Sequence, residues 1–192
     1  MKELSEMTLE ELWELFPIIL KEHNPKYKDW YEIERKNLCE RFKEKIIRIN
    51  HIGSTAVEGL IAKPTVDILM EISMDTNIDK LKGTLKDMGW ILMNSSESPE
   101  FRLTFNKGYT KLGFAEKVYH LHIRYLGNYD ELYFRDYLIE HNETAKEYEA
   151  LKLNLWKKFE HDRDRYTEAK REFVLRVSKQ AKEEYKDRYL IL

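Results

Sequence analysis

The stretch His51-Ile-Gly-Ser-Thr-Ala-Val-Glu-Gly-Leu-Ile-Ala-Lys-Pro-Thr-Val-Asp-Ile-Leu-Met-Glu71 places a polar turn between two apolar segments, and it decides the fold. The alternation of apolar residues over 46–52 predicts a half-buried strand that stops at Gly53. The run from Val66 to Ile72 predicts a second strand. Asp67 lies early in that strand among apolar residues, where a charge needs a partner, and a metal ion is a suitable one.

A phosphate-binding turn is predicted at Gly53, Ser54 and Thr55. Glycine lets the backbone turn sharply and approach a ligand closely. The two residues that follow offer hydroxyls and backbone N–H groups, a set of donors that suits a phosphate. The turn and the acid of the next strand therefore predict one site for an anion and its cation.

Several motifs, in order along the chain, resemble one known family. The arrangement of a Gly-Ser turn after one strand and an acid early in the next resembles that of the nucleotidyltransferase superfamily. The more specific resemblance is to the GrpB family, proteins with the nucleotidyltransferase fold, and it covers roughly residues 25 to 180. The matching segments are His51 to Leu60, Ala62 to Ile68, His120-Leu-His122, Phe134-Arg-Asp-Tyr-Leu138, Glu147-Tyr-Glu-Ala-Leu-Lys152 and Tyr166-Thr-Glu-Ala-Lys170.

This resemblance implies an α+β fold of the nucleotidyltransferase type, with a mixed β-sheet flanked by helices and C-terminal helices packed alongside. It also implies that the protein binds a nucleoside triphosphate, or another phosphorylated small molecule, together with a divalent metal. The implied reaction transfers a nucleotidyl group to a hydroxyl or phosphate of an acceptor, as the metal neutralises charge and pyrophosphate leaves. Mg²⁺ or Mn²⁺ is the expected metal, with Zn²⁺ as the alternative.

The residues that the resemblance assigns to this chemistry fall into two groups. Asp67 and His122 are the catalytic candidates, and the metal ligands are Asp67, His120 and His122, because imidazoles favour transition metals. Strand spacing puts the two histidines on one face about 7 Å apart. The nucleotide and its phosphates are expected to contact Gly53, Ser54, Thr55, Lys63, Arg135, Lys152 and Lys170.

The residue two positions after Asp67 departs from the superfamily pattern, because Leu69 stands where a second carboxylate is expected. Glu71 shares that strand face, but strand rise places it roughly 13 Å from Asp67 along the backbone, against roughly 7 Å for adjacent residues of one face. Two other functions therefore stay open. One is a non-catalytic module that binds a nucleotide or phosphometabolite, and the other is an Asp/His metal-dependent phosphotransferase or hydrolase.

Composition favours one domain over residues 1–192, because 192 residues with 42% hydrophobic content suffice for one core. The formal net charge of −2 argues against general nucleic-acid binding. A single cysteine, Cys39, excludes an internal disulfide. With no apolar run of membrane-spanning length and no signal-like segment, we expect a cytoplasmic protein that does not bind membranes, and the oligomeric state stays open.

Hydrophobic periodicity sets the expected order of elements. We expect a sheet core over about 46–124 and a helical part over about 128–187, where apolar residues recur at helical spacing. Within the sheet part, a helix is expected over 75–87 and a loop over 106–116, which contains two glycines. The remaining strands are expected over 90–94, 101–105 and 118–124.

Overall fold

A mixed β-sheet lies at the centre of the molecule. The computed structural model describes residues 2–190, and in it five strands lie in the order β1-β2-β5-β4-β3. β2 and β5 are parallel, and the other neighbouring strands are antiparallel, so the predicted mixed sheet is confirmed. The strands are β1 (Ile46–Ile52), β2 (Val66–Ile72), β3 (Ile91–Ser96), β4 (Arg102–Thr110) and β5 (Gly113–Tyr125).

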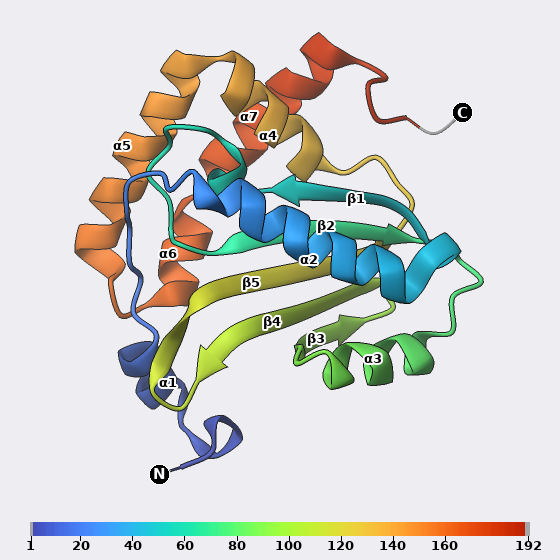
Figure 1. The fold of residues 1–192 in the computed structure, drawn as a ribbon. Coiled ribbons are helices and arrows are strands. Elements are labelled where there is room, and N and C mark those ends of the chain that lie inside the picture. The colour runs from blue at the N-terminus through green and yellow to red at the C-terminus, as the bar shows by residue number, and fades with distance from the viewer. Residues whose placement is uncertain (1, 191–192) are drawn as a thin grey trace.

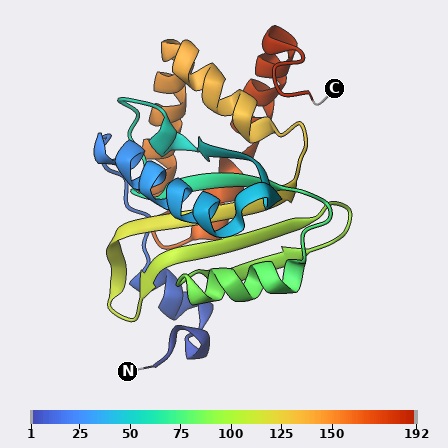
Figure 2. The same cartoon turned by 45° about the vertical axis from the view of Figure 1, so that its right-hand side comes forward.

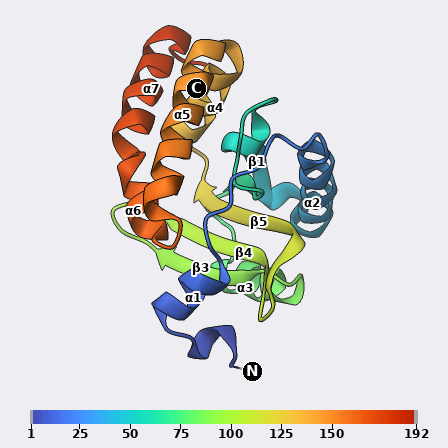
Figure 3. The same cartoon turned by 90° about the vertical axis from the view of Figure 1, so that its left-hand side faces the viewer.

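Helices cover the sheet on both faces. Helix α2 lies on one face, and the C-terminal helices α4 to α7 lie on the other (Figures 1 and 3), as predicted for an α+β fold. Figure 2 shows α3 beside the outer strands, on the side of α2. The helices are α1 (Leu9–Leu15), α2 (Lys26–Phe42), α3 (Ile78–Asp87), α4 (Asp130–Glu140), α5 (Asn142–Phe159), α6 (Arg163–Ala169) and α7 (Arg171–Tyr185). Within residues 2–190, no helix combines the length and the apolar character needed to cross a membrane.

Alternation along the central strands separates a core from a polar face. Val66, Ile68 and Met70 of β2 are fully buried in the cluster formed with α2 and α3. Successive side chains of a strand point to opposite faces. Asp67 and Glu71 therefore face α4 to α7, on the side where a site can form.

The prediction of a loop over 106–116 is wrong. β4 continues to Thr110 and β5 begins at Gly113, so this segment is a β-hairpin in which Tyr109 pairs with Phe114. Gly108 has φ +90° at a register shift, and a Cβ at this position would lie 2.2 Å from the carbonyl oxygen of Lys117. The glycine is thus required by a bulge between paired strands and does not mark a loop.

Candidate functional site

The parallel pairing of β2 with β5 brings the predicted acid and histidines together. Asp67 is in register with His120, and Leu69 is in register with His122. The Nδ1 atom of His120 lies 3.0 Å from Oδ1 of Asp67, and Nε2 of His122 lies 3.8 Å from the same oxygen. The three side chains therefore form one cluster, which we call the Asp/His cluster.

The donor atoms of the Asp/His cluster fit a divalent cation. One ligand atom from each of its three residues lies within 4.8 Å of the others. One carboxylate and two imidazoles suit Zn²⁺ or Mn²⁺ better than Mg²⁺. On its other nitrogen, His120 is 2.7 Å from the hydroxyl of Tyr109, an outer hydrogen bond of the kind that orients metal-bound histidines.

The protonation states of Asp67 and His120 at neutral pH favour metal binding at the Asp/His cluster. Burial alone would raise the pKa of Asp67, but the hydrogen bonds from His120 and His122 outweigh burial and lower the pKa below its usual value. Burial lowers the pKa of His120 to about 4, against the opposing effect of Asp67. At neutral pH the acid is thus ionised and this imidazole is neutral, the two forms that bind metals.

The Gly53 turn lies directly against the carboxylate of Asp67. Gly53 has φ +73° and ψ −174°, a conformation that other residues avoid. A Cβ on Gly53 would lie 2.6 Å from Oδ2 of Asp67. Glycine at this position is therefore explained both by backbone conformation and by the close approach of turn and acid.

Two buried hydroxyl contacts hold this turn in place. The hydroxyl of Thr55 donates to the carbonyl oxygen of Thr65 at 3.0 Å and lies 2.9 Å from Nε2 of His51. The ring of His51 in turn stacks on Tyr31 of α2, with ring centroids 4.9 Å apart. The side chain of Thr55 is thus engaged within the turn, while the hydroxyl of Ser54 accepts a hydrogen bond from Lys152 at 3.2 Å.

A cavity of about 300 Å³ opens beside the turn and contains the Asp/His cluster. It lies between the sheet and helices α5 and α6, and most of the residues that line it have a polar or charged side chain. Six of the seven expected phosphate-binding residues line it, namely Gly53, Ser54, Thr55, Lys63, Lys152 and Lys170, together with Arg163. We call this space the phosphate cavity.

Three lysines and a single carboxylate line the phosphate cavity. Lys152 is buried, and Lys63 and Lys170 are half-buried. Burial is the main cause that lowers the pKa of Lys63 to about 7, of Lys152 to about 7 and of Lys170 to about 8. Among the described residues, neither Lys63 nor Lys170 has an ion pair with a carboxylate. Lys152 donates to Ser54 at 3.2 Å and to the carbonyl oxygen of Ile61. Such a concentration of lysines at buried and half-buried positions favours an anionic ligand, which would restore the full charge of each lysine.

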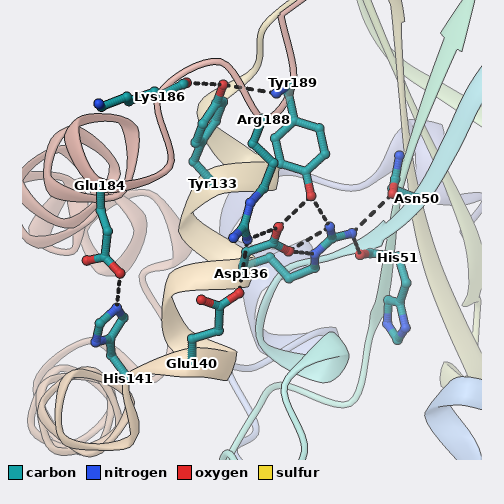
Figure 4. A network of polar contacts seen from close by, with 11 residues as sticks. Asn50, His51, Tyr133, Asp136, Glu140, His141, Glu184, Lys186, Arg188 and Tyr189 are labelled. Atoms are coloured by element: carbon teal, nitrogen blue, oxygen red, sulfur yellow. Dashed lines mark hydrogen bonds and ion pairs between the residues drawn. The ribbon is translucent and has the colours of Figure 1, made fainter.

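Arg135 lies outside the phosphate cavity. It bonds to members of a separate polar network, in which Figure 4 labels His51, Asp136 and Tyr189. Its guanidinium donates to the carbonyl oxygen of His51 at 3.0 Å and to the hydroxyl of Tyr189 at 2.8 Å. It also forms an ion pair with Asp136 at 2.7 Å. The structure therefore places Arg135 where it joins β1, α4 and the C-terminal segment.

Glu71 shares the sheet face of Asp67 but has partners of its own. Its side chain is fully buried and forms two contacts with Arg48, at 2.5 and 2.7 Å. Its carboxylate also accepts from the backbone N–H of Gly127 at 3.0 Å. Glu71 therefore forms a structural ion pair and leaves the Asp/His cluster with a single carboxylate.

Two residues of the site were not predicted from the sequence. Tyr109 contacts His120 from the β4–β5 hairpin, in the segment expected to be a loop. Arg163, at the start of α6, brings its guanidinium to 3.4 Å from Nε2 of His120. Neither residue stands in a recognisable motif, and long-range pairing alone brings them to the cavity.

Known proteins resemble this chain over most of its length. Glutamate-rich protein GrpB of Alkalihalophilus pseudofirmus is 32% identical over 161 residues, which are 82% of this chain and 91% of that protein. UPF0157 protein PA4798 of Pseudomonas aeruginosa is 35% identical over 130 residues, 67% of this chain but 53% of that longer protein.

A solved structure agrees with these sequence matches. The crystal structure of conserved protein GrpB from Enterococcus faecalis superposes with a TM-score of 0.76 at 29% identity, covering 87% of this chain and 99% of that one. The family model described as GrpB protein matches residues 17–180, which include the turn, the Asp/His cluster and the three lysines. The chain belongs to the GrpB family, as its motifs indicated.

Proposed function

We propose that the protein binds a nucleoside triphosphate and a divalent cation and transfers the nucleotidyl group to an acceptor hydroxyl. The observation that carries this proposal is the direct contact between two unlike sites. The phosphate cavity, which is lined by one buried and two half-buried lysines, suits an anion, and the carboxylate–imidazole cluster that lines the same cavity suits a cation. A metal–phosphate ligand is the chemistry that satisfies both at once.

The phosphate chain would lie along the lysines. Lys152 is buried next to Ser54, and Lys63 and Lys170 line the same cavity. Because their pKa values are lowered, these lysines become fully protonated only when an anion binds beside them. The added positive charge then attracts the anion more strongly. Arg163 supplies a further cation beside His120. These four side chains would orient the triphosphate and stabilise the charge of the leaving pyrophosphate.

Asp67 and His120 would hold the cation beside the phosphates. When bound, the ion neutralises charge at the α-phosphate and lowers the pKa of the attacking hydroxyl. His122 is more exposed than His120, and its polar contact among residues 2–190 is the 3.8 Å approach to Asp67. In this proposal His122 accepts the proton of that hydroxyl. The hydroxyl oxygen forms a bond to the α-phosphorus, the bond from this phosphorus to the bridging oxygen breaks, and pyrophosphate leaves.

A thermal-shift panel tests this proposal. The four nucleoside triphosphates are added with and without Mg²⁺, Mn²⁺ or Zn²⁺, at about 100 times the Kd, where binding contributes about 2.7 kcal/mol and raises Tm by about 5–10 °C. We expect a rise that requires metal and is lost in Asp67→Ala but kept in Asp87→Ala, which removes an exposed acid of α3. Release of pyrophosphate in the presence of hydroxyl compounds then tests transfer.

The alternatives give different results in the same panel. Stabilisation by nucleotide without metal indicates a binding module, which the leucine at position 69 favours. Stabilisation by metal alone, lost in His122→Ala, makes His122 a metal ligand and supports an Asp/His phosphotransferase or hydrolase, which the imidazole-rich donor set favours. The absence of any shift would refute the proposed ligands.

A further inference from the structure

A second hollow also reaches the Asp/His cluster, and most of its lining surface is apolar. It has a volume of about 540 Å³ and lies between α1 and the outer strands β3 and β4. Leu12 and Trp13 of α1 form one wall, and Leu92 and Met93 of β3 form the other. We call this space the apolar groove. Its size is that of a small-molecule site.

The apolar groove opens onto the proposed reaction centre. His120, His122 and Arg163 line both the groove and the phosphate cavity, so the two hollows meet at the imidazoles. The walls of the groove are apolar, but its end at the imidazoles is polar, because Tyr109, which contacts His120, belongs to its lining. A ligand here would have an apolar body and a polar end near His122.

Aromatic packing fixes α1 in position, so the apolar groove exists before any ligand binds. The ring of Phe16, just after α1, lies 4.9 Å from the ring of Tyr109 and 5.1 Å from that of Phe114. Both of these rings belong to the β4–β5 hairpin. A preformed groove binds with less ordering cost than one assembled around its ligand.

Large apolar side chains at the rim of the groove remain exposed to solvent. Leu9 is 51% exposed, Ile91 is 44% exposed and Met93 is 56% exposed. Covering such surface is favourable in proportion to its area. Both walls come from one chain and enclose a concave space with a polar end, a shape that suits a small molecule better than the flat face of a second copy.

We propose that the apolar groove binds the acceptor of the transfer reaction, a small molecule with an aliphatic or aromatic body and a terminal hydroxyl. This inference rests on the proposed function, because the hydroxyl would lie beside His122. A nucleobase fits the groove less well, because its edge carries several hydrogen-bonding groups, whereas the surface of the groove is largely apolar even though Thr104 and Asn106 of β4 belong to it. The groove therefore selects the acceptor by its apolar body.

Primary n-alkanols from butanol to octanol are the probes, with binding to the full chain measured by titration calorimetry. We expect affinity to rise about fourfold for each added methylene, the value for burying one such group. Met93→Lys should weaken octanol binding at least tenfold. Met74→Lys is the matched control, because Met74 is 81% exposed in the turn after β2, away from the groove.

The outcomes separate this inference from the proposed function. Equal octanol affinity in wild type and Met93→Lys, or no alkanol binding at all, overturns the groove as a ligand site. A dimer in sedimentation that becomes monomeric in Met93→Lys would instead assign the groove to a second copy. Weaker binding of a nucleoside in Met93→Lys would assign it to the base. If alkanols bind as expected but no nucleotide raises Tm, the apolar site stands and its role as an acceptor site fails.

Discussion

Replacing Gly53 by alanine tests how closely the turn and the acid of the site depend on each other. The added Cβ would lie 2.6 Å from Oδ2 of Asp67 and 3.3 Å from its Cβ and Cγ, so the whole carboxylate must move. Movement breaks the 3.0 Å contact of Asp67 with His120. We therefore expect Gly53→Ala to destabilise the fold and to remove metal binding together.

The free-energy cost of Gly53→Ala has two parts. Holding alanine at φ +73° and ψ −174° costs about 1–3 kcal/mol. Loss of the charged hydrogen bond of Asp67 costs about 1.5–3 kcal/mol. The total of about 2.5–6 kcal/mol is a large fraction of the stability of a typical domain, which is about 5–15 kcal/mol.

Urea unfolding followed by circular dichroism measures this cost, with two controls. Gly59→Ala also places alanine at positive φ, +77°, but no described atom lies within 4 Å of its Cβ, so only the backbone part should appear. In the Asp67→Ala background the cost of Gly53→Ala should fall by about 1.5–3 kcal/mol, the coupling between the two positions. The proposed contact is refuted if Gly53→Ala lowers the free energy of unfolding no more than Gly59→Ala does, and lowers it equally in the wild type and in Asp67→Ala.

Three further predictions concern other buried charges. Lys152→Met should abolish the rise in Tm caused by nucleotide and metal, whereas Lys157→Met, at an exposed position of α5, should keep it in the same thermal-shift assay. Burial lowers the pKa of His51 to about 4, so stability should fall by at most about 3 kcal/mol as pH decreases from 6.5 to 4, and acid titrations monitored by urea unfolding should show a smaller fall in His51→Gln. Glu71→Gln leaves the charge of Arg48 without its partner and should cost about 3 kcal/mol in urea unfolding, and a cost under 1 kcal/mol would contradict the structural role of the pair.

Local patterns predicted the strands and helices well, because the spacing of apolar residues within one segment shows which of its faces is buried. Alternation over 46–52 matches β1, and the run from Val66 to Ile72 matches β2. The hairpin of β4 and β5 was missed because glycine usually interrupts a strand, and only cross-strand pairing reveals that Gly108 lies at a bulge. A pattern confined to one segment carries no information about that pairing.

The candidate site was predictable where its residues stand in motifs, and not where distant segments meet. The spacing of His120 and His122 places them on one face, but their approach to Asp67 depends on the parallel register of two strands far apart in sequence. Arg163 reaches the cluster from α6 without any local signal. Conversely, Arg135 stands in a motif of the family and yet lies outside the phosphate cavity, where it bonds to groups of β1, α4 and the C-terminal segment.

The sequence separation of the site contacts bears on how the protein is made. The contact of Asp67 with His120 joins residues 53 positions apart, and that of Lys152 with Ser54 joins residues 98 positions apart. A nascent chain that has emerged from the ribosome only as far as β5 can form the first contact. It still lacks α5, and therefore Lys152, which lines the phosphate cavity. Capture of a ligand during translation must therefore wait until α5 has left the exit tunnel.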